Sequence, residues 1–378
     1  MKKLLSALLC AVLLLSGVPA RAAGPGELKA QSALLMEKET GQILYEENSH
    51  EKLEPASVTK VMTLLLVMEA IDAGRLSLQD TVTASRHAIS MGGSQIWLKE
   101  NEQLTVDEMI KAVAVVSAND CAVALAEAVA GSEESFVQRM NQRAAELGMA
   151  DTHFVNCTGL PAQGHLTSAH DIALMSRELI LRHPEIRNYT TIWIDSLRDG
   201  ASQLVNTNKL IRFYDGATGL KTGSTDSALF CLSATAERDG MELIAVVMKS
   251  PTSPERFEAA KTLLNYGFAN YTLLDVYPGQ AIAPVTVNLG RQETVQPLLA
   301  RSSRLLLEKD KAGRVTTRLS LAEAVEAPVE KGQTLGQMEV LVDDVVVESI
   351  PLVADTAVER LSTLGIFRGL LRRLFSGV

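Results

Sequence analysis

The sequence predicts an α+β fold, because strand-like segments stand near both ends of its main part and helical segments lie between them. The first two strand-like runs flank the turn sequence at residues 39–42, and this arrangement predicts a hairpin. The last two flank Asp239-Gly240, a pair typical of tight hairpin turns. We expect the terminal runs to pair in one sheet against a helical body. The four runs are residues 33–36, 43–45, 228–234 and 243–248.

Helical signals fill the middle of the chain. Residues 61–68 are almost entirely apolar, which predicts a buried helix that ends at Gly74. Thr105 and Glu108 have the spacing of a capping box, in which the two side chains satisfy backbone N–H groups at a helix start. Ser168 is expected to cap a later helix. Further helices are expected at 120–130 and 135–147.

The composition is that of a folded globular protein without a nucleic-acid partner. Hydrophobic residues make up 47% of the chain and charged residues 21%, which excludes a disordered or fibrous protein. The formal net charge is -9, and an acidic protein repels the phosphate backbone of nucleic acids. Cys121, Cys157 and Cys231 are too few and too scattered for a disulfide framework, so we expect buried thiols.

The first 22 residues have the features of a secretory signal peptide. Two lysines precede an apolar stretch at 4–15, and Ala20 and Ala22 have the small side chains that a signal peptidase requires. The stretch is short for a membrane span, although an uncleaved anchor is the alternative. Removal of residues 1–22 takes away three basic residues and no acids, so the formal charge would change from -9 to -12. We therefore expect an exported protein.

Three regions are expected after the signal peptide: a main domain at 23–274, a small β-rich domain at 278–355 and a helix at 356–378. The helix is amphipathic and carries four arginines, and such a helix can lie in a membrane surface. Docking on the protein itself is the alternative. Together with the signal peptide, the helix predicts the extracytoplasmic face of the cytoplasmic membrane. Strands of the small domain are expected at 285–289, 304–308, 316–319, 337–342 and 345–350.

The sharpest chemical signal is the Ser-x-x-Lys pattern at Ser57 and Lys60, at the start of the predicted buried helix. Residues three apart on a helix face the same side. A serine hydroxyl is a weak nucleophile until a base takes its proton, and a lysine amine can do so once burial or nearby positive charge lowers its pKa. By itself the pattern is also typical of an ordinary helix start with a solvated lysine.

Two further motifs change the interpretation. Ser117 and Asn119 stand in a Ser-Ala-Asn sequence where one predicted helix ends and the next begins. Lys221, Thr222 and Gly223 come directly before a predicted strand, which would place the lysine on a sheet edge where the glycine allows close approach of a substrate. Each motif alone is commonplace. In this order and spacing the three match the signature of β-lactamases and penicillin-binding proteins.

With these motifs, the chain resembles the low-molecular-mass penicillin-binding proteins that act as serine-type D-alanyl-D-alanine carboxypeptidases, peptidase family S11. Segments at 92–94, 153–160 and 253–257 are also similar to that family. The resemblance implies a β-lactamase/transpeptidase-like domain, an antiparallel sheet with helices on both sides, then a small all-β domain and an amphipathic helix. It also implies removal of the terminal D-alanine from peptidoglycan pentapeptide stems through an acyl-enzyme, and covalent inhibition by β-lactam antibiotics.

The same resemblance assigns roles to the motif residues. Ser57 would be the acylated nucleophile and Lys60 its general base. Ser117 would relay a proton to the leaving D-alanine, and Asn119 would hold either the peptide carbonyl of the substrate or Lys60. Lys221 would supply positive potential and orient the Ser117 hydroxyl.

The remaining roles concern the oxyanion and the substrate's terminal carboxylate. Backbone N–H groups of Ser57 and Ser224 would form the oxyanion hole. Thr222 and Arg256 are the candidates for binding the carboxylate. Some relatives carry an arginine in the segment that corresponds to residues 206–209, and this chain has none there, which makes Lys209 a third candidate.

No cofactor or metal is expected. His165 and His170 have the wrong spacing for one helix face, and no His-Glu-x-x-His pattern occurs. The chain also lacks a glycine-rich phosphate loop followed by Lys-Ser or Lys-Thr.

Two rival functions remain open. A class A β-lactamase shares the motifs but needs a glutamate to activate the deacylating water, and the segment at 154–160 lacks one. A catalytically idle cell-wall-binding protein would keep the fold, although the intact motifs argue against it. Transpeptidase or endopeptidase action would use the same acyl-enzyme.

Overall fold

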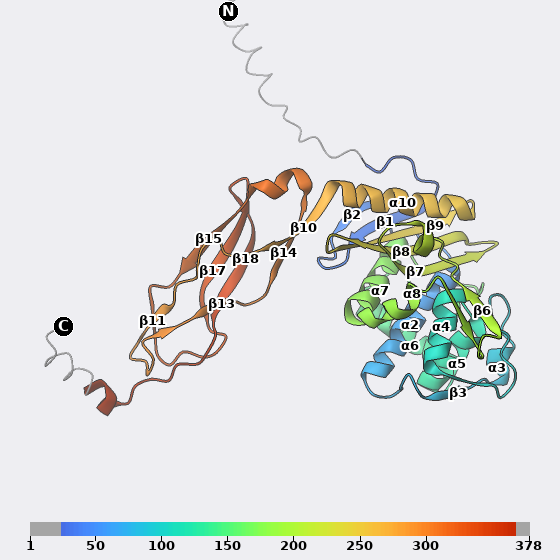
Figure 1. The fold of residues 1–378 in the computed structure, drawn as a ribbon, viewed down its shortest axis with the longest axis horizontal. Coiled ribbons are helices and arrows are strands. Elements are labelled where there is room, and N and C mark those ends of the chain that lie inside the picture. The colour runs from blue at the N-terminus through green and yellow to red at the C-terminus, as the bar shows by residue number, and fades with distance from the viewer. Residues whose placement is uncertain (1–23, 368–378) are drawn as a thin grey trace, which may run out of the picture.

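The computed structural model describes residues 24–367. A domain of mixed helix and sheet is followed by a small β-rich domain that extends away from it (Figure 1). The predicted signal peptide lies outside the described residues.

A five-stranded antiparallel sheet forms the centre of the first domain, in the order β2-β1-β9-β8-β7. The strands that come first and last in the sequence, β1 and β9, are neighbours in this sheet, with Leu34 of β1 opposite Val246 of β9. Asp239 and Gly240 adopt φ values of 50° and 76° at the β8–β9 turn, as the Asp-Gly pair predicted. The prediction that the terminal runs share a sheet is therefore confirmed. The strands are β1 (Ser32–Glu37), β2 (Ile43–Glu47), β7 (Ala217–Thr225), β8 (Leu229–Arg238) and β9 (Met241–Ser250).

Successive side chains of the sheet point to opposite faces and fill two separate cores. Leu34 and Val246 belong to the core shared with the helical body, whereas Leu35 and Ala245 pack in the core under helix α10 (Ser253–Asn270). Figure 1 shows α10 along one side of the sheet and helices α2 and α7 on the other. Helices therefore cover both faces.

The helical body forms largely where local signals predicted it. Thr105 accepts a hydrogen bond from the Glu108 N–H at 3.2 Å, and the Glu108 carboxylate accepts one from the Thr105 N–H at 2.8 Å, which confirms the capping box. Ser168 caps α7. The helices are η1 (Ala56–Thr59), α2 (Lys60–Asp72), α3 (Arg86–Ile89), α4 (Val106–Val116), α5 (Asn119–Ala130), α6 (Glu133–Glu146), α7 (Ala169–Arg182), η2 (Pro184–Ile186), α8 (Arg187–Thr190) and α9 (Leu210–Phe213). Two short hairpins join them, β3 (Thr81–Thr83) with β4 (Gln103–Thr105) and β5 (Ile194–Leu197) with β6 (Ser202–Val205).

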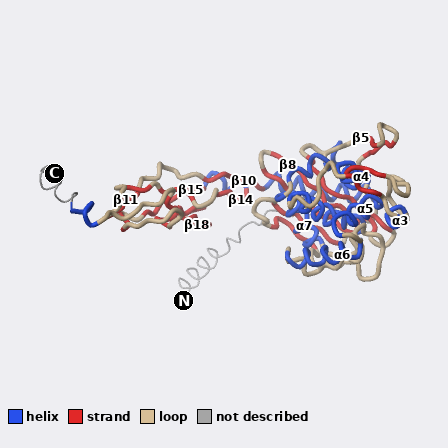
Figure 2. Tube along the Cα trace, turned by 90° about the horizontal axis from the view of Figure 1, so that it is seen from below, coloured by secondary structure: helices blue, strands red, loops and turns tan. Residues whose placement is uncertain are grey.

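The second domain consists mainly of strands and loops (Figure 2). All five of its predicted strands are present, as β11, β14, β15, β17 and β18. The domain begins earlier than residue 278, where the sequence predicted its start. Helix α10 ends at Asn270, and the next residue starts β10, which pairs with β14. Its elements are β10 (Tyr271–Val276), β11 (Val285–Asn288), β12 (Thr294–Val295), β13 (Pro297–Leu299), β14 (Ser303–Glu308), η3 (Lys309–Arg314), β15 (Val315–Leu321), β16 (Ala324–Glu326), β17 (Thr334–Val342) and β18 (Val345–Ala354).

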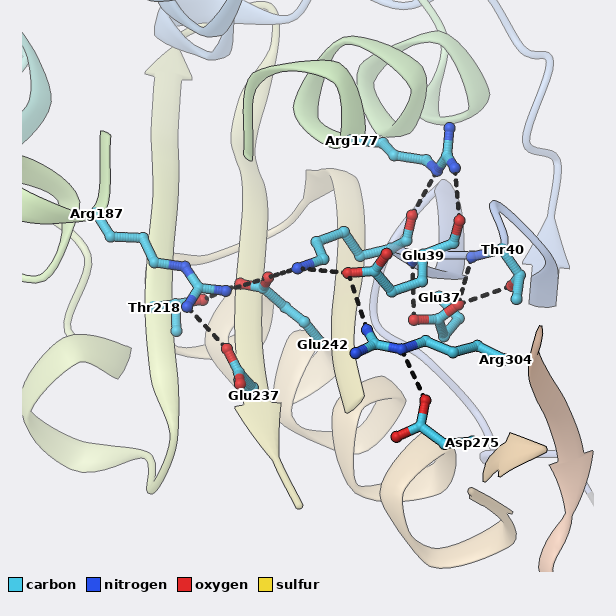
Figure 3. Close-up of polar contacts among 11 residues, drawn as sticks. Glu37, Glu39, Thr40, Arg177, Arg187, Thr218, Glu237, Glu242, Asp275 and Arg304 are labelled. Atoms are coloured by element: carbon cyan, nitrogen blue, oxygen red, sulfur yellow. Dashed lines mark hydrogen bonds and ion pairs between the residues drawn. The ribbon is translucent and has the colours of Figure 1, made fainter. Parts of the chain in front are cut away.

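A polar network lies at the end of the sheet, next to the second domain (Figure 3). The buried carboxylate of Glu242 accepts a hydrogen bond from Arg187 and lies 3.2 Å from the amine of Lys38. Arg304 of β14 lies 3.6 Å from Glu39 in the β1–β2 turn, so the network crosses from one domain to the other.

The described part of the C-terminal segment and the three described cysteines test two further predictions. Within residues 24–367, none of the helices has both the length and the apolar character needed to cross a bilayer. The prediction of a helix from residue 356 is corrected: Val358 is buried and pairs with Val329, and Arg360 pairs with Gly290, so this stretch packs on the β-rich domain. Helix is described only at residues 363–367, where Leu364 and Phe367 are exposed. The three cysteines at positions 121, 157 and 231 are free and buried, as expected.

Candidate active site

Ser57 and Lys60 are in direct contact. Ser57 lies in η1, and Lys60 is the first residue of α2. The Lys60 amine donates hydrogen bonds to the Ser57 hydroxyl at 3.0 Å and to the carbonyl of Thr158 at 2.7 Å. The turn at Ser57 is a 3-10 turn rather than an α-helical one, and in such a turn residues three apart eclipse each other. The local geometry therefore sets the amine directly against the hydroxyl.

The burial of Lys60 suits it to act as a base. Its side chain is fully buried, and this burial lowers the pKa of the amine to about 7, although nearby Cys157 and Asp120 act in the opposite direction. A buried ammonium lacks the hydration that stabilises its charge, so the neutral amine gains in population. At neutral pH about half of the molecules then carry an amine able to accept a proton.

The Thr158 carbonyl that meets Lys60 is itself held in place by Asn156. The Asn156 side-chain oxygen accepts hydrogen bonds from the backbone N–H groups of Thr158 and Gly159, at 3.2 and 2.7 Å. A Cβ atom on Gly159 would lie only 1.8 Å from the carbonyl oxygen of Ala56, so this loop packs tightly against the turn before the nucleophile. The sequence marks Asn156 and Thr158 only as part of a family-like segment, and their role was missed because it depends on a contact across 98 residues.

Ser117 and Asn119 stand at the junction of α4 and α5. Ser117 has a left-handed backbone with φ 66°, and its hydroxyl is buried without a hydrogen-bond partner among the residues that the structure describes. Asn119 donates from its side chain to the Gly92 carbonyl at 2.6 Å, while its side-chain oxygen is buried and has no partner within the described part of the chain. A buried hydroxyl and a buried amide oxygen without partners are ready to meet an incoming ligand.

The Lys-Thr-Gly motif lies inside β7, the edge strand of the sheet, rather than directly before a strand as predicted. Lys221 is buried, and its amine donates to the Thr222 carbonyl at 2.9 Å. The pKa of Lys221 is held well below its usual range, first by burial and then by the positive charges of Lys60 and Arg256. The predicted hydrogen bond from Lys221 to Ser117 is not among the contacts of the described residues.

Gly223 brings the edge strand against the nucleophile turn. A Cβ atom at this position would lie 2.7 Å from the Pro55 carbonyl oxygen and 2.9 Å from the backbone nitrogens of Ser57 and Val58. The absence of a side chain therefore serves backbone-to-backbone packing, in addition to any approach by a substrate. Ser224 is the next residue of the strand, so its backbone stands beside that of Ser57.

The two main candidates for binding the substrate carboxylate, Thr222 and Arg256, have different hydrogen-bond partners in the structure. Thr222 donates from its hydroxyl to the hydroxyl of Thr207 at 2.8 Å. Arg256 was predicted to bind the carboxylate, but its guanidinium is buried and donates to the carbonyls of Gly223 and Cys231, at 3.0 and 3.2 Å. These bonds allow Arg256 to position the strand behind Gly223, and its contact with the substrate carboxylate stays a prediction. Burial lowers the pKa of Arg256 to about 10, so it stays positively charged at neutral pH.

One group of side chains in the described part of the chain has a spacing that could hold a metal ion, away from these residues. The ligand atoms of Asp72, His183 and Glu185 lie within 4.8 Å of one another. Asp72 ends α2, whereas Lys60 begins it, and twelve residues of helix separate them by about 18 Å. An ion there could not act on Ser57.

The fold and these contacts fit one class of protein, the serine acyl-transfer enzymes with the fold of penicillin-recognising proteins, in which a buried lysine amine lies against the serine hydroxyl. Comparisons with known proteins agree. The family model described as D-alanyl-D-alanine carboxypeptidase matches residues 19–252, and that of the penicillin-binding protein 5 C-terminal domain matches residues 275–360. The chain belongs to the D-alanyl-D-alanine carboxypeptidase family, the low-molecular-mass penicillin-binding proteins.

Relatives cover the chain nearly end to end. The D-alanyl-D-alanine carboxypeptidase DacF of Bacillus subtilis is 42% identical over 366 residues, covering 94% of this chain and 94% of its own. The carboxypeptidase DacD of Escherichia coli is 34% identical and covers 87% of each chain. The crystal structure of penicillin-binding protein 5 from Haemophilus influenzae has 30% identity and a TM-score of 0.78, covering 90% of this chain and 100% of that one.

A structure with a bound antibiotic is also similar. Penicillin-binding protein D2 of Listeria monocytogenes in its ampicillin-bound form has 33% identity and a TM-score of 0.59, covering 64% of this chain and 98% of that one.

Proposed function

We propose that this protein is a serine D-alanyl-D-alanine carboxypeptidase that removes the terminal D-alanine of peptidoglycan pentapeptide stems through an acyl-enzyme on Ser57. One observation carries the assignment of the nucleophile: the fully buried Lys60 amine lies 3.0 Å from the Ser57 hydroxyl. A nucleophile and its base within hydrogen-bond reach are the geometric requirement for this chemistry. Family membership supports the choice of substrate.

The proposed reaction has two halves. Neutral Lys60 takes the Ser57 proton as the oxygen attacks the carbonyl between the two D-alanines, and backbone N–H groups of Ser57 and Ser224 receive the developing oxyanion. Protonated Lys60 gives this proton to Ser117 as Ser117 passes its own to the nitrogen of the leaving D-alanine, so the acyl-enzyme remains with Lys60 neutral again. Water then attacks the ester, with Lys60 again as base, which frees the shortened stem and restores the serine.

For the terminal carboxylate we propose the paired hydroxyls of Thr222 and Thr207 as hydrogen-bond donors. They are 2.8 Å apart, and Thr207 stands in the segment where some relatives carry an arginine. Arg256 contributes its positive field through the strand, because its guanidinium donates to the Gly223 carbonyl next to Thr222. Lys209 remains a candidate for a second cationic contact.

The carboxypeptidase assay tests this proposal. We expect purified protein to release D-alanine from a pentapeptide stem, and the variants Ser57→Ala and Lys60→Ala to lose the release by at least about 10³-fold. A matched control is Ser349→Ala, which removes an exposed hydroxyl from β18 in the second domain. Full activity in either active-site variant would overturn the roles of Ser57 and Lys60, and a folded wild-type protein that releases no D-alanine would favour an idle cell-wall-binding protein.

Penicillin separates the carboxypeptidase from a class A β-lactamase. An acidic group that does contact the 154–160 segment, Glu133, already accepts a hydrogen bond from the Cys157 N–H at 3.0 Å and contacts His87. With Glu133 so engaged, we expect a penicilloyl adduct on Ser57 that persists and is visible as an added mass. Rapid turnover of penicillin without an adduct would favour the lactamase.

Export and membrane attachment are proposals that rest on sequence alone. We propose that residues 1–22 direct export and that the amphipathic segment 356–378 binds the outer surface of the cytoplasmic membrane. A chain truncated after residue 361, which keeps the buried Val358 and its pairing with Val329, should stay active and move from the membrane fraction to the soluble fraction. If it still sediments with membranes, that segment is not the anchor.

A further inference from the structure

An exposed tryptophan stands in the loop that borders the proposed active site. The loop runs between α3 and β4, and its Gly92 and Ser94 carbonyls accept hydrogen bonds from Asn119, at 2.6 and 2.7 Å. Three residues after Ser94, the side chain of Trp97 is 74% exposed. An indole ring left this open loses the apolar burial that normally places tryptophan inside a protein.

The backbone of Trp97 is held in a conformation that a tryptophan does not favour. Its φ is 59°, in the left-handed region where glycine or asparagine is the ordinary choice and a bulky residue is an outlier. Strained backbone of this kind persists only where the surroundings fix it, and it gathers at functional sites. The loop therefore keeps a tryptophan where the needs of folding alone would select another residue.

The surroundings do fix it, through the neighbour of Asn119. The fully buried carboxylate of Asp120 accepts hydrogen bonds from the backbone N–H groups on either side of Trp97, those of Ile96 at 3.2 Å and Leu98 at 3.1 Å. From the β5–β6 turn, Arg198 donates to the Ile96 carbonyl at 3.0 Å. These contacts tie the tryptophan to the same helix start that carries the proposed substrate-binding amide.

We propose that Trp97 is a specificity-determining residue that packs against the part of the stem peptide preceding the two terminal D-alanines. The proposal rests on the carboxypeptidase function and extends it to the length of substrate that the enzyme prefers. Three residues of chain place Trp97 within about 10 Å of Ser94, and a four-residue stem in extended form spans about 13 Å. A stem bound at Asn119, whose N–H binds the Ser94 carbonyl, is therefore long enough to contact the indole.

A substrate series tests this proposal. For Trp97→Ala, kcat/KM should fall about tenfold on the free pentapeptide, the size of effect expected for one aromatic contact, and stay unchanged on N-acetyl-D-alanyl-D-alanine. Tyr277→Ala is the matched control, because that ring is 72% exposed between β10 and β11 of the second domain. Equal loss on both substrates, or no loss on either, overturns the proposal. Loss only on a pentapeptide that carries its sugar also overturns it, in favour of a glycan contact.

The unfolding temperature distinguishes a substrate contact of Trp97 from a structural role. Asparagine tolerates the left-handed backbone, so Trp97→Asn should unfold at the same temperature as the wild type or a higher one, and still lose the pentapeptide preference. A marked fall in the unfolding temperature would show that the indole supports the fold, and would overturn the proposal.

Fluorescence gives a reading independent of turnover. The chain has two tryptophans, so Trp193→Phe leaves Trp97 as the sole indole emitter. In that background, with Ser57→Ala to prevent reaction, the pentapeptide should shift or quench the emission, and N-acetyl-D-alanyl-D-alanine at equal occupancy should not. The activity of the unmodified enzyme on the short substrate tests the carboxypeptidase function itself, so failure of one idea is distinguishable from failure of the other.

Discussion

The lowered pKa of Lys60 predicts the pH dependence of acylation. Burial brings this pKa from 10.5 to about 7. At pH 7 an ordinary lysine has about one neutral amine in 3,000, whereas Lys60 has about one in two. The neutral amine is the form that accepts the Ser57 proton, so burial raises the reactive population by about 10³-fold.

The acylation rate should therefore rise with pH until Lys60 is deprotonated. Below pH 7 the acylation rate should fall about tenfold for each pH unit, as Lys60 becomes protonated, and above pH 8 it should level off. The rate constant for penicillin labelling of Ser57, measured between pH 5 and 9 by mass spectrometry, checks this.

A variant without a titratable amine at position 60 is the control for this pH dependence. Lys60→Arg, whose guanidinium stays charged, should be inactive throughout this pH range. A labelling rate that does not change between pH 5 and 9, or one that keeps rising to pH 10, would refute the assignment of Lys60 as a base tuned by burial.

Three further substitutions test how the site is built. Gly223→Ala should slow labelling of Ser57 by at least tenfold with the overall fold kept, because the new methyl group would push β7 away from backbone atoms 2.7 to 2.9 Å distant; circular dichroism and labelling kinetics check this. Asn156→Ala should release the loop that presents the Thr158 carbonyl to Lys60, and the midpoint of the labelling pH profile should move; an unchanged midpoint would count against this positioning role. Lys60→Met should abolish labelling yet raise the unfolding temperature at pH 7. Folding lowers the pKa of Lys60 and so costs about 4 kcal/mol at this pH, and the methionine removes that cost. The hydrogen bonds that are lost contribute only about 2 to 3 kcal/mol. The wild type binds fewer protons folded than unfolded between pH 7 and 10.5, so its stability rises with pH and the advantage of the methionine variant should shrink; an advantage that grows would contradict this.

The parts of the site that sequence could predict are local. Ser57 and Lys60 are three residues apart, and one turn of helix brings them together whatever the rest of the chain does. The capping box at Thr105 is local in the same way. Short spacing with fixed backbone geometry is what a single sequence records well.

The parts that sequence could not predict depend on packing between distant segments. Thr158 reaches Lys60 across 98 residues, and Thr207 meets Thr222 across 15. A sequence likewise does not show that the guanidinium of Arg256 donates to two backbone carbonyls. The start of the second domain was placed too late for a similar reason, since the strand of β10 is defined by its partner β14.

The two domains are joined directly, which fixes the start of the β-rich domain against the first domain. No loose segment separates α10 from β10, and the Lys309 amine binds the Phe268 carbonyl at 2.6 Å while Arg304 bridges to Glu39. The β-rich domain thus acts as a rigid spacer. If the far end of that spacer is held at a membrane surface, as we propose, its length sets the height above that surface at which Ser57 meets stems, and a few glycines added to the join would widen that range without changing the active site.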